Sequence, residues 1–163
     1  MPKLMVLGYG RHGKDTACEI LAEEYGLSFV SSSLFCAEHV IMPACNGRYK
    51  TVEECYADRH NYREFWYQTI SEYNTPDKTH LGRAIFKKYD IYCGIRNVEE
   101  LRALEHAGVF DYSIWIDRSR HLPRESNASC TVRPYHADFI INNNGPIEDL
   151  RGWLINFMET WVI

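Results

Sequence analysis

The sequence lacks the features that would place the protein in a membrane, in a secretory compartment or around a structural zinc ion. None of its apolar stretches approaches the roughly 20 residues that a membrane-spanning helix needs. No secretory leader is recognisable, and the six cysteines include no C-x-x-C pair and no zinc-ligand spacing. We therefore expect a cytoplasmic protein with reduced thiols and no membrane partner.

The sequence also lacks an excess of positive charge. It has 18 Lys and Arg against 22 Asp and Glu, which gives a formal net charge of -4. Because nucleic-acid binding depends on phosphate neutralisation, any contact with DNA must come from a local basic patch. Internal repeats, low-complexity tracts and linkers are absent as well, so residues 1–163 are expected to form a single domain.

The sequence does contain an alternation of short apolar strands and amphipathic helices. Strands are expected over residues 3–7, 27–30, 90–93, 112–116 and 137–141, and helices over 14–25, 78–88, 98–107 and 146–161. This alternation predicts a three-layer α/β fold, with a parallel sheet of about five strands and helices on both faces. The loops that leave the strands then share one edge, where the ligand site is expected.

Two segments depart from this alternation. Residues around 45–88 are expected to form a helical insertion, opened by a T-x-x-E capping box at Thr51 and Glu54. A short helix before this insertion is expected to end at Pro43. Residues around 117–130, which include the basic stretch "DRSRHLPRES", are expected to form a lid-like loop after the fourth strand.

The stretch "GYGRHGKDT" lies between the first strand and the first helix. It fits the phosphate-loop pattern G-x-x-x-x-G-K-[ST] from Gly8 to Lys14, although Asp15 replaces the hydroxyl residue. Glycines let backbone N–H groups converge on phosphate oxygens, and a helix N-terminus behind them favours an anion. The flanking strand and helix disfavour the alternative of a plain glycine-rich turn. The residues expected to bind ATP are Gly8, Tyr9, Gly10, Arg11, His12, Gly13, Lys14, Asp15 and Thr16.

Three residues are candidate ligands of Mg²⁺. The carboxylate of Asp15 is a hard oxygen ligand in the first turn of the helix, and Thr16 offers a neighbouring hydroxyl. Asp117 ends the fourth strand, where it could orient the metal or simply cap the following turn. The expected cofactors are therefore ATP and Mg²⁺.

Phosphoryl transfer depends mainly on positioning and charge neutralisation, so cations near the phosphate loop are catalytic candidates. Lys14 is expected to contact the outer phosphates. Arg118, Arg120 and Arg124 of the lid-like loop are expected to neutralise charge on the γ-phosphate, with solvated surface positions as the alternative. Asn143, after the fifth strand, is either a contact to the nucleotide base or a turn residue.

The acceptor side is expected to involve the third strand and the stretch "DRHNYREFWYQTISEYN". Arg96 is a candidate for holding an acceptor phosphate, with an ion pair to Glu99 or Glu100 as the alternative. Asp58 is the preferred acceptor of the hydroxyl proton, and Glu64 stays open. The remaining candidates could hold a base between aromatic and polar groups, although the tryptophan is more typical of a core: Arg59, His60, Asn61, Arg63 and Trp66.

Several stretches resemble known kinases. "GKDT" after a short strand is similar to the loop of phage deoxynucleoside monophosphate kinases and their thymidylate-kinase-like relatives. "GIRNVEEL", "IWIDRS", "ADFIINNNGPIEDL" and the stretch from Asp58 resemble small phage P-loop kinases, some of which act on 5-hydroxymethyluracil in phage DNA. This resemblance implies a P-loop kinase fold and transfer of the ATP γ-phosphate, in the host cytoplasm if the protein is phage-encoded.

The acceptor stays open between two kinase readings. The resemblance favours the 5-hydroxymethyl group of 5-hydroxymethyluracil in DNA, the first step of thymine hypermodification, over a free deoxynucleoside monophosphate. A chain of this size has room for only a short lid, which suits an open acceptor side and a flipped base. The negative net charge favours a free nucleotide instead. A nucleotide-dependent switch is a third reading, and the oligomeric state is not predicted.

Overall fold

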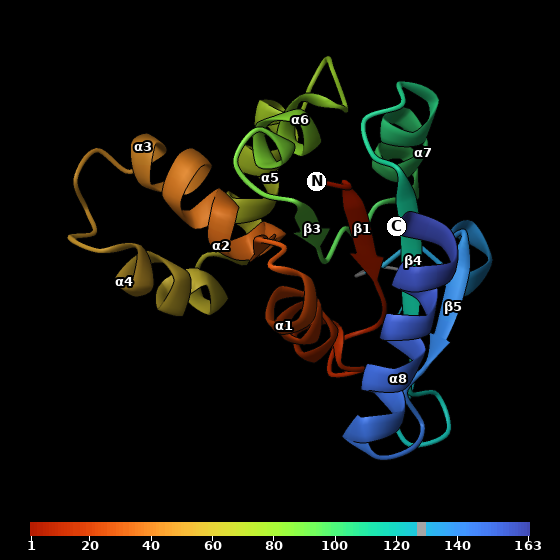
Figure 1. The fold of residues 1–163 in the computed structure, drawn as a ribbon. Helices are drawn as coiled ribbons and strands as arrows, with labels where there is room; N and C mark the ends of the chain where they lie inside the picture. The colour runs from red at the N-terminus through yellow and green to blue at the C-terminus, as the bar shows by residue number, and fades with distance from the viewer. Residues whose placement is uncertain (127–129) are drawn as a thin grey trace.

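The computed structural model describes residues 1–126 and 130–163, which are built around a five-stranded parallel sheet (Figure 1). The strand order is β2-β3-β1-β4-β5, with every neighbouring pair parallel. This confirms the predicted α/β architecture. The strands are β1 (Leu4–Leu7), β2 (Phe29–Ser31), β3 (Ile91–Cys93), β4 (Tyr112–Asp117) and β5 (Phe139–Asn142).

The central strand β1 sets the register of the sheet. Leu4 is the partner of Ile91 in β3 and of Tyr112 in β4. Because all strands run the same way, their carboxyl ends meet at one edge of the sheet. The loops after β1, β3, β4 and β5 therefore converge there, as the order of elements predicts.

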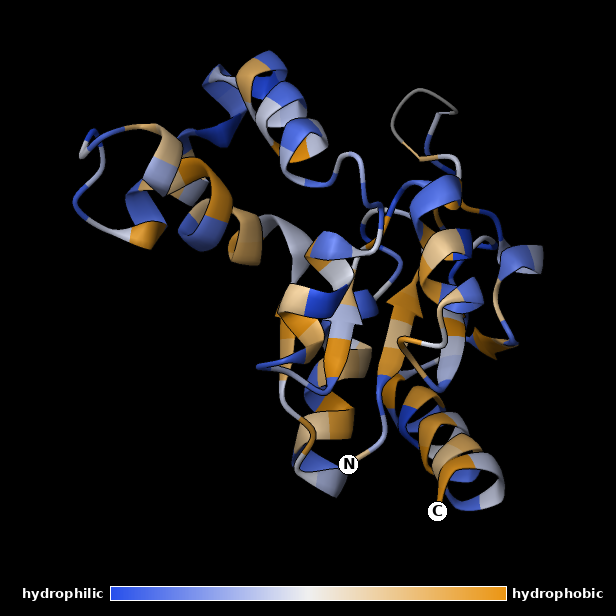
Figure 2. Cartoon of the chain, turned by 90° about the horizontal axis from the view of Figure 1, so that it is seen from above, coloured by the Kyte–Doolittle hydropathy of each residue, from blue (hydrophilic) through white to orange (hydrophobic). Residues whose placement is uncertain are grey.

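Helices cover both faces of the sheet because side chains along a strand alternate between them. Leu4 and Val6 of β1 belong to a cluster with α1 (Lys14–Tyr25) and α8 (Ile147–Phe157). The alternate residues Met5 and Leu7 belong to a second cluster with α6 (His80–Phe86) and α7 (Val98–His106). Figure 2 shows apolar strand residues enclosed between these helices.

A group of helices between β2 and α6, here called the helical arm (residues 32–73), extends away from the sheet (Figure 1). At its base, Phe35, Cys55 and Trp66 are buried in the cluster that also contains Met5. The arm therefore packs on the same core as the sheet. It consists of α2 (Ser32–Cys36), the π-helical turn η1 (Ala37–Ile41), α3 (Met42–Ala44), α4 (Val52–Ala57), the 3₁₀ turn η2 (Asp58–Asn61) and α5 (Arg63–Tyr73).

The structure confirms one of two helix boundaries that the sequence predicts in the arm and contradicts the other. The backbone N–H of Glu54 donates to Thr51 Oγ1 over 3.1 Å, which confirms the predicted start of α4. The prediction that Pro43 ends the preceding helix is wrong, since the helical run continues to Ala44. Pro43 lies inside this run, in α3, which directly follows the π-helical turn η1.

The C-terminal part of the chain closes one face and one edge of the sheet. The 3₁₀ turn η3 (Pro134–His136) precedes β5, so the strand starts at Phe139 rather than at residue 137. After α8, the π-helical turn η4 (Met158–Val162) ends the helical run. Among residues 1–126 and 130–163, no helix combines the length and the apolar character that crossing a membrane requires.

Candidate active site

The loop from Gly8 to Thr16 connects β1 to α1 at the carboxyl edge of the sheet. Gly13 caps α1 with a φ of 101°, a conformation that side-chain-bearing residues rarely adopt. A Cβ on Gly13 would lie only 2.3 Å from Asn143 Nδ2, and one on Gly8 would lie 2.9 Å from the Ile116 carbonyl oxygen. Glycine is therefore required at both positions, and the loop curls tightly around the start of α1.

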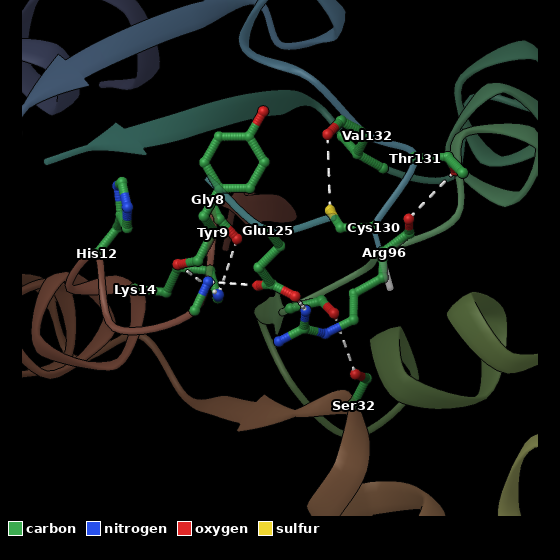
Figure 3. Close-up of polar contacts among 12 residues, drawn as sticks. Gly8, Tyr9, His12, Lys14, Ser32, Arg96, Glu125, Cys130, Thr131 and Val132 are labelled. Carbon is green, nitrogen blue, oxygen red and sulfur yellow. Dashed lines mark hydrogen bonds and ion pairs between the residues drawn. The ribbon is translucent and has the colours of Figure 1, made fainter. Parts of the chain in front are cut away.

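Lys14 folds back over this loop. Its Nζ donates to the carbonyl oxygens of Gly8, over 2.8 Å, and Tyr9, over 3.2 Å (Figure 3). Burial and the nearby Arg96 guanidinium lower the pKa of Lys14, while Glu125 and Asp15 act in the opposite direction. The ammonium group thus lies at the mouth of the loop, within reach of an anion held by the loop amides.

Glu125 places an internal anion against the loop. One carboxylate oxygen accepts from the backbone N–H of Gly10, and the other accepts from Arg96 Nη1 (Figure 3). Burial opposes ionisation of Glu125, but Arg96 and the Gly10 amide prevail and lower its pKa. A carboxylate is therefore held by the Gly10 amide, which the sequence assigns to ATP, and by Arg96, which the sequence assigns to an acceptor phosphate.

His12 connects the loop to the segment after β4. Its ring is fully buried, and its Nδ1 accepts from the backbone N–H of Arg118 over 3.0 Å. Since Nδ1 accepts, Nε2 carries the proton and donates to the Pro123 carbonyl oxygen over 3.1 Å. Both ring nitrogens are thus used to fix the tip of the loop. Of the other loop side chains, Arg11 is exposed and has a φ of 65°, and Tyr9 is buried against Trp115 with ring centroids 4.8 Å apart.

The candidate magnesium ligands lie in two different settings. Asp15 is exposed in the first turn of α1, and Cys93 Sγ contacts its Oδ1 over 3.6 Å. Thr16, next in the helix, is partly buried. Among the residues that the structure describes, no three His, Cys, Asp or Glu side chains gather as a metal site. The carboxylate of Asp15 and the hydroxyl of Thr16 are oxygen donors of the kind that Mg²⁺ takes, so these two residues fit a Mg²⁺ ion.

Asp117 is occupied by the turn that follows β4. Its Oδ1 accepts from the Ser119 N–H over 3.1 Å, and its Oδ2 is 3.4 Å from Asn144 Nδ2. These contacts favour the capping alternative over a metal role. Asn143 is buried, and its Nδ2 donates to the His12 carbonyl oxygen over 2.9 Å, which holds the phosphate loop against the end of β5.

The arginines of the predicted lid-like loop separate in the structure. Arg118 Nη1 donates to the Asn143 carbonyl oxygen over 2.7 Å, so this guanidinium lies beside the end of β5. Arg120 and Arg124 are exposed, and the Arg120 backbone N–H donates to Asn144 Oδ1. Their roles toward the γ-phosphate stay predictions. Part of the segment predicted as lid-like, residues 127–129, lies outside the described residues.

A cavity of about 480 Å³ lies between the sheet edge, the helical arm and α7. Arg96 contributes to its wall and also pairs with Glu125, which joins the cavity to the phosphate loop. A volume in this range accommodates a small-molecule ligand. The polar and charged residues of its wall include Ser32, Ser33, Ser71, Asn74, Thr75, Lys78, Arg96, Asn97, Glu100 and Thr131, and its apolar ones include Tyr67, Ile70, Leu81 and Tyr92.

The acceptor candidates of the helical arm do not line this cavity, in contrast to Arg96. The Arg59 guanidinium lies 3.9 Å from the centre of the Tyr56 ring, and Arg63 contacts His60 over 3.1 Å. Trp66 is buried in the core, which agrees with the alternative that this tryptophan is a core residue rather than a ligand contact. The cavity is lined instead by a different set of α5 residues, namely Tyr67, Ile70 and Ser71.

The two candidate proton acceptors also lie on the arm. Asp58 accepts from the Tyr49 hydroxyl and from Asn61 Nδ2, each over 2.7 Å, and these bonds lower the pKa of Asp58. Glu64 is exposed in the first turn of α5. Neither residue lines the cavity, so the geometry gives no support to either one as the group that takes the acceptor proton.

Two functional candidates were missed by sequence reasoning. In the sequence, Glu125 is one residue of a basic loop, and its contact with Gly10 spans 115 positions, which no local pattern reveals. Glu100 was considered only as an ion-pair partner of Arg96, but Arg96 pairs with Glu125 instead. The sequence offers one indication of a role for Glu100, which is that it lies four residues after Arg96, at the start of the helix that follows the third strand.

Comparison by sequence gives no relatives. No protein-family model matches the chain, and no curated protein matches it.

Comparison of structures finds kinases that are similar to this chain over nearly its whole length. A sugar kinase from Janibacter sp. has a TM-score of 0.52 and 17% identity, covering 99% of this chain and 96% of its own. A shikimate kinase from Aquifex aeolicus has a TM-score of 0.54 and 14% identity, covering 96% of each chain. A shikimate kinase from Bacteroides thetaiotaomicron has a TM-score of 0.50 and 12% identity, covering 99% of each chain. The fold is therefore that of the small P-loop kinases.

Proposed function

We propose that the protein is an ATP-dependent phosphotransferase that phosphorylates a hydroxyl group of an acceptor held in the cavity beside Arg96. The observation that carries this proposal is the position of the Glu125 carboxylate against the loop. The Gly10 amide and Arg96 hold the Glu125 carboxylate beside Lys14, where a polyphosphate would lie. The small kinases of the same fold support the proposal.

The arrangement assigns a role to each part of the site. The acceptor oxygen bonds to the γ-phosphorus, the bond from that phosphorus to the β,γ-bridging oxygen breaks, and the hydroxyl proton leaves to a base or to water. The loop amides and Lys14 bind and orient the phosphates. Asp15 and Thr16 would hold Mg²⁺, which neutralises phosphate charge when bound. Arg96 lies between the loop and the cavity, where charge develops during transfer.

For the acceptor, we propose a deoxynucleotide-type hydroxyl. The stretches downstream of the loop resemble small phage P-loop kinases, some of which act on modified bases in DNA, and this resemblance supports the 5-hydroxymethyl group of 5-hydroxymethyluracil in phage DNA. A base flipped out of DNA would enter the cavity as a single nucleotide. The arm residues that sequence reasoning assigned to base binding lie outside the cavity, which removes one argument for this acceptor.

A free deoxynucleoside monophosphate is the alternative acceptor. Two observations favour it: the cavity volume suits one small molecule, and the net charge of -4 opposes binding to a DNA backbone. A nucleotide-dependent switch would leave the cavity beside Arg96 without a purpose.

The experiment that tests this function offers several acceptors in parallel. The protein is incubated with γ-labelled ATP and Mg²⁺, together with free deoxynucleoside monophosphates, plain DNA or DNA that contains 5-hydroxymethyluracil. Label only in the modified DNA supports the DNA acceptor, and labelled diphosphates support the free nucleotide. If ATP binds but no acceptor is labelled, the result favours the switch; if ATP does not bind, the proposed function is wrong.

A further inference from the structure

Glu100 is the feature of the cavity that the proposed function does not yet use. It supplies the only carboxylate among the described residues that line the cavity, whereas Lys78 and Arg96 supply the two cations. The other polar lining groups are hydroxyls, amides and backbone. An acidic group in a cavity meant for phosphate chemistry needs a physical reason, because it repels the anions that the cations attract.

The position of Glu100 in α7 does not supply this reason. Asn97 caps the helix, and its Oδ1 accepts from the Glu100 backbone N–H over 3.0 Å. A glutamate at this third helical position commonly reaches back to the amide of the capping residue. Instead, Glu100 Oε1 accepts from the Tyr92 hydroxyl over 2.8 Å. The carboxylate is thus fixed by a buried tyrosine at the wall of the cavity.

The surroundings of Glu100 are unfavourable for its charge. Burial raises the pKa of Glu100 to about 7, although the Tyr92 hydroxyl and Lys78 both act to lower it. A carboxyl group kept in such a place destabilises the folded chain when it is ionised. Groups of this kind concentrate at functional sites, where a ligand supplies the missing partner.

The cations of the cavity lie on its exposed side. Arg96 pairs with Glu125, and Lys78 lies 3.7 Å from Glu99. Both cations are partly exposed, so an anionic ligand can replace these carboxylates as their partner. Among the described lining residues, the cavity therefore combines a cationic rim with one carboxylate, which the Tyr92 hydroxyl holds in the wall.

We propose that Glu100 is the acceptor-specificity residue of this enzyme. It accepts a hydrogen bond from an O–H or N–H group of a small anionic acceptor whose charged group is bound by Arg96 and Lys78. This inference rests on the proposed function, since it takes the cavity as the acceptor site. It names the substrate class as a hydroxylated anion with a second hydrogen-bond donor, of which a nucleotide is one example.

The test compares Glu100→Gln with Glu105→Gln, which changes an exposed carboxylate of the same helix that does not line the cavity. The acceptors are 5-hydroxymethyl-dUMP, its uncharged nucleoside, and DNA that contains 5-hydroxymethyluracil. For the labelled acceptor, Glu100→Gln should raise KM at least about tenfold, because the amide loses the charged hydrogen bond. The calorimetric Kd for ATP should not change. The ionisation near neutral pH in the kcat/KM profile should disappear in Glu100→Gln and persist in Glu105→Gln.

A second variant protects the test against a folding defect. Tyr92→Phe removes the hydroxyl that stabilises the ionised carboxylate, so the midpoint of the acceptor kcat/KM profile should move to higher pH. Circular dichroism checks that each variant is folded. If Glu100→Gln fails to fold and Tyr92→Phe leaves the profile in place, the inference is wrong.

The outcomes separate this inference from the proposed function. If the wild-type protein binds no ATP, or binds ATP and labels no acceptor, the proposed function fails. If ATP binds and transfer occurs, but Glu100→Gln keeps the wild-type KM and pH profile, only the role of Glu100 is overturned. Transfer to the uncharged nucleoside with an efficiency equal to that of the nucleotide would also overturn the proposed substrate class.

Discussion

The phosphate loop and the helical arm both contain residues that the sequence predicts to bind a ligand, but the structure supports this prediction only for the loop. In the loop, each glycine and Lys14 has a local purpose, since the loop directly joins the end of β1 to the start of α1. In the arm, Arg59, His60 and Arg63 form an equally conspicuous polar cluster, yet they contact one another and Tyr56. A cluster of polar side chains therefore indicates a ligand only where the backbone geometry also requires one.

The largest expected effect tests the loop side of this comparison. Lys14→Ala removes the cation that lies beside the loop amides, so turnover should fall at least about 100-fold. A coupled assay of ADP release measures the loss. Lys87→Ala, which changes an exposed lysine after α6, is the matched control and should keep full activity. Equal rates for the two variants would contradict the assignment of Lys14.

The second prediction concerns how Glu100, in the wall of the cavity, makes the stability of the folded chain depend on pH. The pKa of Glu100 is raised from 4.5 to about 7 in the folded chain, so between these values the folded state holds a proton that the unfolded state releases. Stability should therefore fall as pH rises through this interval, by roughly 3 kcal/mol at most.

Urea unfolding at pH 5 and pH 8 measures this effect. Relative to the wild type, Glu100→Gln should gain stability at pH 8 and gain little at pH 5. Comparison of the two proteins cancels the contributions of the other carboxylates. A difference between them that does not depend on pH would show that Glu100 has an ordinary pKa.

The third prediction compares the two aspartates assigned to Mg²⁺. Asp15→Asn should raise the Mg²⁺ concentration needed for half-maximal turnover about tenfold, because an amide is a weaker ligand than a carboxylate. Asp117→Asn should have a smaller effect on that concentration, since Asp117 is held by Ser119 and Asn144. A magnesium titration in the kinase assay measures both, and a larger shift for Asp117→Asn would reverse the assignment.

The fourth prediction concerns the internal anion. Glu125→Gln removes the negative charge that competes with phosphate at Gly10, so the Kd for ATP should fall by about three- to tenfold. Isothermal titration calorimetry gives the value. Glu53→Gln, an exposed arm position, is the control. Weaker ATP binding in Glu125→Gln would instead mean that Glu125 orders the loop for the nucleotide.

The smallest effect is expected for substitutions in the helical arm. A large effect there would contradict the conclusion that the arm does not bind a ligand. Arg59→Ala and Arg63→Ala remove side chains that contact neighbouring arm residues and do not line the cavity, so kcat/KM for the acceptor should change by less than about twofold. The same acceptor assay measures it. A loss of tenfold or more with DNA, but not with a free nucleotide, would restore the arm as a nucleic-acid surface.

The sequence allowed prediction of the sheet, its helices and the loop because those depend on short-range patterns. The apolar runs before Gly8 and Gly94 and the capping at Thr51 are local, and local reasoning found them. Contacts across the chain could not be found that way. Glu125 meets Gly10, and Cys130 and Thr131 share a cavity wall with α5, only because the parallel strands gather distant loops at one edge.

The buried ring of His12 has a consequence for how the loop can vary. Positions between the first glycine and the last one of such a loop pattern are written as free, yet this imidazole joins Arg118 and Pro123 through both nitrogens. No other side chain offers one donor and one acceptor in a ring of that shape. Transfer of these nine residues into another kinase would therefore carry the motif without its anchor, and a chimera would need the segment after β4 as well.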